Sequence, residues 1–329
     1  MIRLKRTLAL LLAGICIQSG YAMTFYGKPY TEDMPPMSIS RFLCEMGLDF
    51  ETYHAMMLEM STAGEYPHFI EDNIKRYLFF QAKNPDIPFG TVIAYVNVNV
   101  DIGFYHNIET VPNPYEFSTL VNKNFALPAN WEPDDFVNIG SGHRLRSDAA
   151  EQLAKMRTAI SEDGLRLQLI ASFRSYQTQA GTHARGVRRH GLASADRQFA
   201  RAGHSEHQLG LAVDILHRSG FQFMTQARFQ YTREFDWLME NAHNFGFILR
   251  YPDEYRHIHG YIFEPWHWRF VGVEIATAMY NEGIILFEEF YGRYLAPAVL
   301  ERAQRELFSH LICTVCEKRL AFLQLANPS

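Results

Sequence analysis

Two short segments of this sequence carry residue types that commonly bind a divalent metal. One holds Ser205, His207 and Asp214 in the pattern S-x-H-x-x-G-x-A-x-D, and the other runs from Glu264 to His267 as E-x-x-H. Imidazole nitrogens and carboxylate oxygens are ordinary zinc ligands, so we predict that His207, Asp214 and His267 share one Zn²⁺. Three protein ligands leave the fourth position open for water, which is the arrangement of catalytic zinc sites.

The spacing of these residues predicts how the chain must fold around the metal. His207 and Asp214 are seven residues apart, and one helix would not bring such a pair together at a metal. A turn at Gly210 that leads into a strand carrying Asp214 is therefore required. Glu264 is the candidate general base, which would take a proton from the water and pass it to a leaving amine.

A third segment predicts recognition of a carboxylate. It runs from Ser172 to Gln179, and it follows an alternating apolar stretch over 165–170 that is typical of a half-buried strand, so Arg174 lies at a strand end. A guanidinium group binds a carboxylate through two parallel hydrogen bonds, which suits an enzyme that acts at the end of a peptide. Gln179 is placed to add a further donor.

In this order, the three segments resemble the VanY-type D-alanyl-D-alanine carboxypeptidases, a family of zinc peptidases. The resemblance covers about 118–292 and includes the stretches 120–128 and 244–252. It implies zinc ligands at His207, Asp214 and His267, the catalytic base at Glu264, and substrate contacts at Arg174, Gln179 and Ser205. The chain departs from the family at Phe173, where many members have tyrosine.

The resemblance also implies a fold and a reaction. The family fold is a small antiparallel sheet flanked by helices, with zinc in a cleft on the sheet. The mixture of short strands and irregularly placed helices independently favours an α+β fold. The expected reaction is removal of the last D-alanine from a peptidoglycan stem peptide. Alternatives are an L,D-carboxypeptidase acting on tetrapeptide stems, and a non-catalytic cell-wall binding protein on a peptidase scaffold.

The N-terminus is typical of a secretory signal. Basic residues precede an almost wholly apolar run over 7–17, and small residues at 20 and 22 mark a cleavage site. The run is shorter than the roughly 20 residues of a membrane-spanning helix, which favours a signal over an anchor. We therefore expect an extracytoplasmic protein. The predicted organisation is a signal peptide over 1–22, a mostly helical extension over 23–117, the zinc carboxypeptidase domain over 118–292 and a helical tail over 293–329.

Charge and cysteine content limit the partners. Cleavage after Ala22 would remove three positive charges and change the net charge from −5 to −8, which does not favour binding to nucleic acid. No protein partner is evident from the sequence. Cys313 and Cys316 could form a local disulfide in an oxidising compartment or remain free thiols, and Cys44 is expected to be a buried thiol.

Local patterns predict the elements around the motifs. The expected strands cover 91–100, 165–169, 212–215, 247–249 and 261–263. The expected helices begin at Ser147, Ser175, Thr232 and about Val273, and Gly164 and Gly246 are expected to end the first and third of them.

Overall fold

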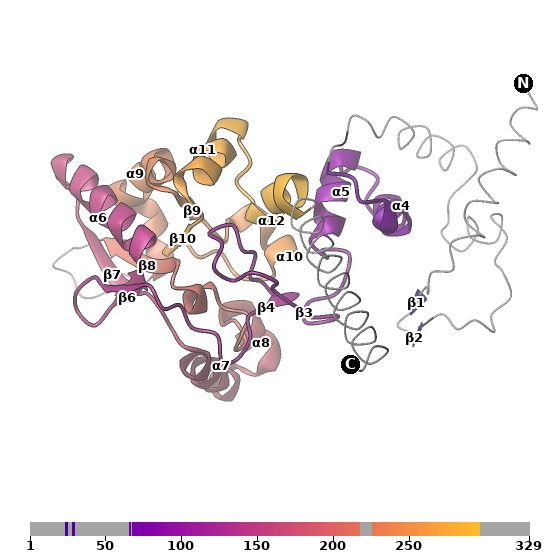
Figure 1. The fold of residues 1–329 in the computed structure, drawn as a ribbon, viewed down its shortest axis with the longest axis horizontal. Helices are drawn as coiled ribbons and strands as arrows, with labels where there is room; N and C mark the ends of the chain where they lie inside the picture. The colour runs from indigo at the N-terminus through magenta and orange to yellow at the C-terminus, as the bar shows by residue number, and fades with distance from the viewer. Residues whose placement is uncertain (1–23, 26–27, 30–65, 67, 218–225, 297–329) are drawn as a thin grey trace, which may run out of the picture. The chain divides into compact units, whose positions relative to one another are not determined.

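The computed structural model describes residues 24–25, 28–29, 66, 68–217 and 226–296 (Figure 1). They belong to two compact units, Met1–Pro67 with Leu78–Asp86 and His68–Tyr77 with Ile87–Ser329. The first unit contains the strand pair β1 (Thr24–Phe25) and β2 (Lys28–Pro29) and the second half of α4 (Ile74–Lys83). The predicted signal peptide, the cysteines and the tail beyond 296 lie outside the described residues.

A four-stranded antiparallel sheet forms the centre of the second unit. Its strand order is β7-β8-β10-β9, with β7 at Leu167–Ala171, β8 at Ala212–His217, β10 at His267–Phe270 and β9 at Phe247–Leu249. A register shift in β7 between Leu169 and Ala171 lets Ala171 pair with Asp214. The two central strands, β8 and β10, are buried along most of their length.

Helices lie on both sides of the sheet. In Figure 1, α6 (Ser147–Glu162), α9 (Arg233–Asn241) and α11 (Val273–Glu282) lie above it, and α7 (Tyr176–His190) and α8 (Leu192–Gln198) lie below it. The main core joins the apolar face of α6 to the sheet. Leu153 and Met156 on α6 share this core with Val213 and Trp268, as expected for an amphipathic helix on a sheet. The fold is therefore α+β with a small antiparallel sheet, as the sequence predicted.

The remaining elements are short. The strand pairs are β3 (Glu109–Thr110) with β4 (Phe125–Ala126), in parallel, and β5 (Phe136–Asn138) with β6 (Arg144–Arg146), antiparallel. The helices are η2 (Glu71–Asn73), α5 (Phe89–Asn97), η3 (Glu206–Leu209), η4 (Gln226–Tyr231), η5 (Ala242–Phe245), η6 (Asp253–Tyr255), α10 (Arg256–His259), α12 (Phe287–Phe290) and the π-helix η7 (Tyr291–Leu295).

Most predicted boundaries near the site are confirmed. Ser175 caps α7 by accepting a hydrogen bond from the Thr178 backbone, and Thr232 caps α9 in the same way. Gly164 and Gly246 have positive φ angles just beyond α6 and η5, where a left-handed residue ends a helix. Ser147 is the first residue of α6 and does not cap it, because Arg146 occupies the cap position.

Two predicted strands are wrong. The stretch 91–100 is mostly helix α5, in which seven of nine residues are buried. A helix that is apolar all round is stable when other elements cover it, and tertiary packing then overrides the β propensity of its valines and isoleucine. The stretch 261–263 is irregular, and the chain resumes a strand only at His267.

Helix α5 precedes the expected domain start at 118 but belongs to the same compact unit. It packs against η7, where the Asn97 side chain donates to the Gly292 carbonyl over 3.0 Å. The predicted domain boundaries, 23–117, 118–292 and 293–329, remain predictions.

No helix among the described residues has both the length and the apolar character needed to cross a membrane.

We expect Gly292→Ala to destabilise the protein, because a Cβ at this position would collide with the backbone of Ala94 in α5. Overpacking of this kind costs about 1–3 kcal/mol of unfolding free energy. Gly181→Ala is the matched control, since its Cβ would meet only the flexible end of Arg185 in α7. Thermal unfolding of both variants checks the expectation, and equal melting temperatures would contradict the described packing of α5 on η7.

Candidate metal centre

His207 is placed by a tight turn between η3 and β8. Gly210 ends η3 with a φ of +68°, which a residue with a side chain rarely adopts. A Cβ there would also lie 2.9 Å from the ring of Phe136. The turn that the sequence required at Gly210 is confirmed. The Nδ1 atom of His207 donates to the Ser172 carbonyl over 2.7 Å, which leaves Nε2 as the free nitrogen.

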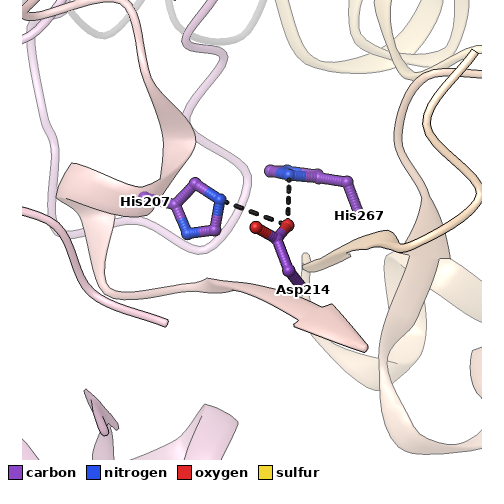
Figure 2. Close-up of side chains that lie close together, drawn as sticks. All are labelled: His207, Asp214 and His267. Carbon is purple, nitrogen blue, oxygen red and sulfur yellow. Dashed lines mark ion pairs between the residues drawn. The ribbon is translucent and has the colours of Figure 1, made fainter. Parts of the chain in front are cut away.

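Strand pairing brings the other two candidate ligands together. Asp214 in β8 and His267 in β10 are direct cross-strand partners. The Oδ1 atom of Asp214 lies 3.3 Å from Nε2 of His207 and 3.2 Å from Nδ1 of His267 (Figure 2). All three side chains are buried, and their ligand atoms lie within 4.8 Å of one another. The structure thus brings the three predicted ligands together.

The geometry around Asp214 suits a cation better than hydrogen bonds. Neither histidine contact with Oδ1 has the alignment of a hydrogen bond, and within the described part of the chain this buried oxygen has no hydrogen-bond partner. The Nε2 atom of His267 faces Glu206 at 3.4 Å, so its Nδ1 is free to face Asp214. Two imidazole lone pairs and a carboxylate oxygen that converge in this way form a donor set for a metal ion.

The charges of the site also favour a cation. Burial works to raise the pKa of Asp214, but the two imidazoles hold it well below its usual value. Burial lowers the pKa of His267, yet the carboxylates of Asp214 and Glu206 outweigh this effect and raise it. These carboxylates therefore stabilise positive charge beside Asp214, which a bound metal ion would supply.

Glu264 lies beside the three ligands, in the turn before β10. Its Oε2 atom is 3.9 Å from Nδ1 of His267, and the side chain is 11% exposed. Burial raises the pKa of Glu264 to about 8 in the metal-free protein, and a bound cation would oppose this shift. A carboxyl group with a raised pKa next to a metal centre can both accept and return a proton near neutral pH.

Of the three predicted substrate contacts, Arg174 lies beside the same centre and Gln179 contacts Arg174. Arg174 extends from the end of β7 so that Nη2 lies 3.9 Å from Asp214 Oδ2. Its Nη1 donates to Gln179 Oε1 over 2.7 Å, and the Gln179 amide donates to the Ala200 carbonyl over 2.6 Å. In this structure Gln179 therefore orients Arg174. Ser205 is buried directly before η3.

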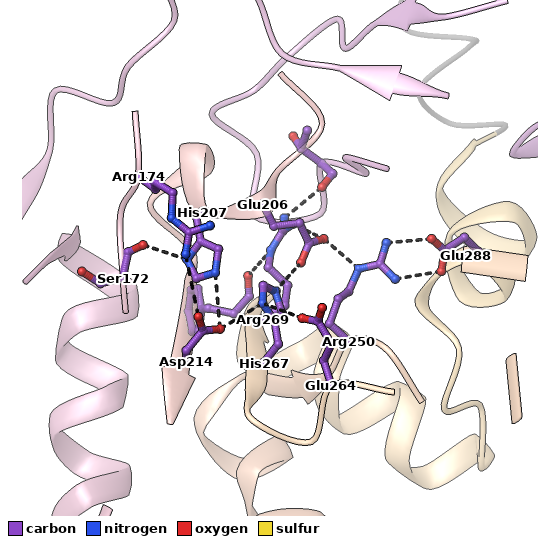
Figure 3. Close-up of polar contacts among 12 residues, drawn as sticks. Ser172, Arg174, Glu206, His207, Asp214, Arg250, Glu264, His267, Arg269 and Glu288 are labelled. Carbon is purple, nitrogen blue, oxygen red and sulfur yellow. Dashed lines mark hydrogen bonds and ion pairs between the residues drawn. The ribbon is translucent and has the colours of Figure 1, made fainter. Parts of the chain in front are cut away.

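Sequence reasoning missed a buried network behind the centre (Figure 3). Its charged members, all 0% exposed, are Glu206, Arg250, Arg269 and Glu288. Two signals could have pointed to it. Glu206 lies inside the first metal motif, and Arg269 follows His267 by two residues in a strand, which places both side chains on one face.

Known proteins resemble this chain in sequence and in fold. The sequence model of the D-alanyl-D-alanine carboxypeptidase family VanY matches residues 142–273. The putative carboxypeptidase YodJ of Bacillus subtilis is 36% identical over 200 residues, which are 58% of this chain and 72% of YodJ. The chain belongs to the VanY family of carboxypeptidases. The family segment contains β7, β8 and β10, the three candidate ligands and Glu264.

Two further similar proteins differ in their described specificity. The bifunctional D-Ala-D-Ala dipeptidase and D-Ala-D-Ala carboxypeptidase VanXYC of Enterococcus gallinarum is 32% identical over 190 residues, 56% of this chain and 97% of that protein. A solved LdcB LD-carboxypeptidase superposes with a TM-score of 0.53 at 35% identity, covering 57% of this chain and 91% of that one. Family membership therefore leaves the cleaved bond open.

We expect the purified protein to carry about one divalent metal ion per chain, because three buried ligands form one site. His207→Ala should lose most of this metal, whereas His257→Ala should keep it, since His257 is exposed and outside the centre. Elemental analysis after dialysis measures both. Full metal content in His207→Ala would contradict the site.

Proposed function

We propose that this protein is a zinc-dependent D-alanyl-D-alanine carboxypeptidase that removes the C-terminal D-alanine from peptidoglycan stem peptides. The observation that carries the proposal is the convergence of two free imidazole nitrogens on the unpartnered oxygen of Asp214, with the Glu264 carboxylate beside them. A binding protein on a peptidase scaffold would not need a base at this position. Two nitrogens and one carboxylate are an ordinary ligand set for catalytic zinc.

The proposed reaction assigns one task to each side chain. Zinc held by His207, Asp214 and His267 would acidify water and polarise the scissile carbonyl. Glu264 accepts the proton of the attacking water and then delivers it to the leaving amino group, so the C–N bond breaks as D-alanine departs. The position of Glu264 supports this role, because its carboxylate lies beside the three candidate ligands, 3.9 Å from Nδ1 of His267.

Arg174 would restrict cleavage to the last residue. Its guanidinium projects from the end of β7 toward the centre, and Gln179 fixes its direction. A terminal carboxylate bound there would place the preceding peptide bond near Glu264. Two parallel hydrogen bonds from arginine to a carboxylate make this contact specific for a chain end.

A second candidate function is L,D-carboxypeptidase activity on tetrapeptide stems, favoured by the similarity to the LdcB LD-carboxypeptidase. The two reactions share the centre and differ in the stem length and the bond that is cleaved. We favour the D,D reaction because the VanY family model and VanXYC are both described as D-alanyl-D-alanine carboxypeptidases.

Incubation of the zinc-loaded protein with synthetic pentapeptide and tetrapeptide stems tests the proposal. We expect D-alanine release from the pentapeptide, seen by mass spectrometry as loss of one alanine, and little change in the tetrapeptide. Cleavage of the tetrapeptide alone would establish the L,D reaction instead. A zinc-loaded protein that cleaves neither stem would refute the carboxypeptidase assignment.

We expect Glu264→Gln to lower the turnover number by about 10²–10⁴-fold, the usual contribution of a general base. Metal content and stem-peptide binding should persist, because Glu264 is not among the three ligand residues. Glu254→Gln is the control, since that carboxylate is exposed and lies in η6. Steady-state kinetics of both variants measures the turnover number. An unchanged turnover number in Glu264→Gln would exclude Glu264 as the base.

We also propose that the protein acts outside the cytoplasm, with residues 1–22 serving as an export signal. Peptidoglycan stems are accessible there, which agrees with the proposed substrate. Cell fractionation followed by N-terminal sequencing should find the protein in the extracytoplasmic fraction, beginning at Met23. An intact N-terminus in the cytoplasm would contradict export.

A further inference from the structure

Four fully buried charges lie behind the metal centre, and the proposed reaction uses none of them. Glu206, Arg250, Arg269 and Glu288 are each 0% exposed, and their charges sum to zero (Figure 3). Buried ion pairs seldom stabilise a fold more than apolar residues of the same size would, because desolvation offsets their attraction. A network of this kind therefore needs an explanation other than stability.

The two oxygens of the Glu206 carboxylate have different partners. Oε1 accepts from Arg250 Nε over 2.7 Å and from Arg269 Nη1 over 2.8 Å. Oε2 faces Nε2 of His267 at 3.4 Å. Because both arginines bind Oε1, they fix the carboxylate plane and leave Oε2 for the histidine.

We infer that Glu206 is a positioning residue for the metal centre, whose Oε2 accepts the Nε2 proton of His267 and so presents the Nδ1 lone pair to the metal. This inference rests on the metal site of the proposed function but not on its substrate. A carboxylate behind a ligating histidine fixes the tautomer and the ring orientation and increases electron donation to the metal.

The two histidine ligands are therefore held in different ways. His207 donates Nδ1 to a neutral backbone carbonyl, that of Ser172, and offers Nε2 to the metal. His267 uses the opposite nitrogens and has a charged acceptor. The ring of Tyr251, tilted by 46° with its centroid 4.9 Å from that of His267, limits the rotation of the histidine further. The strength with which His267 donates electrons to a metal therefore depends on the Glu206 side chain, whereas that of His207 depends on a backbone carbonyl.

The arginines are themselves anchored by separate parts of the chain. Arg250 binds both oxygens of Glu288 in α12, over 2.8 and 2.7 Å. Arg269 donates to the backbone carbonyls of Phe117 and Thr119, each over 2.9 Å. These contacts hold the Glu206 carboxylate from both sides, which a positioning group requires.

Glu206→Gln tests the inference, with Glu288→Gln as the matched control. Each change removes one buried negative charge that pairs with Arg250, but of these two glutamates only Glu206 contacts a candidate metal ligand. With its oxygen facing the two arginines, a glutamine at 206 would turn its NH₂ group toward His267 Nε2. That arrangement favours the tautomer with Nδ1 protonated, which cannot bind metal through Nδ1.

We expect Glu206→Gln to raise the Zn²⁺ dissociation constant about 10–100-fold, measured by competition with a chromogenic chelator. Glu288→Gln should stay within about threefold of the wild type on the same scale. Imidazole ¹⁵N spectra of histidine-labelled protein, loaded with Zn²⁺, should show the Nε2 proton of His267 in the wild type and in Glu288→Gln, and its loss or shift in Glu206→Gln.

Equal zinc affinity in the wild type and Glu206→Gln, or equal weakening in both variants, would overturn the inference while leaving the proposed function intact. A wild type that binds no Zn²⁺ would overturn both. Should Glu206→Gln not fold, the double variant Glu206→Gln/Arg269→Gln restores the charge balance of the network. It should show the same loss of zinc affinity, and wild-type affinity there would refute the role of Glu206.

Discussion

The pairing of β8 with β10 is the constraint on which the rest of the centre depends. It places Asp214 directly across from His267, so two candidate ligands are fixed by backbone hydrogen bonds of a buried sheet. Adjacent antiparallel strands hold opposed side chains close together without any flexible connection. A shift of this register by one residue would turn one ligand to the opposite face. The third ligand, His207, then needs only the tight turn at Gly210 to reach the same point.

The electrostatics of the site follow from taking these groups out of water. Asp214 keeps its charge although it is buried, because two imidazoles face it. For Glu264, burial outweighs the attraction of His267 and Arg174 and raises the pKa to about 8. Two carboxylates a short distance apart thus behave differently because of their neighbours. Asp214 suits a metal ligand that stays charged, and Glu264 suits a group that exchanges protons. Burial alone would not produce this difference.

The sequence was informative where local chemistry decides the structure. The convergence of His207, Asp214 and His267 and the turn at Gly210 could be predicted because the residue types and their spacing are specific, and caps such as Ser175 act within one turn of chain. It failed where packing decides. Residues 91–100 have strand propensity but form mostly helix, because other elements bury them. The partners of Glu206 could not be predicted either, since Arg250 and Arg269 reach it only after the sheet has formed.

The hydrogen bond from His207 to the Ser172 carbonyl can persist while the sequence evolves. A main-chain oxygen is present whatever side chain the codon at 172 specifies, so a point mutation there leaves the acceptor in place. Glu206, by contrast, depends on a single codon. Genetic drift can therefore weaken the two histidine ligands unequally, and natural variants with altered metal retention should arise more readily on the His267 side of the centre.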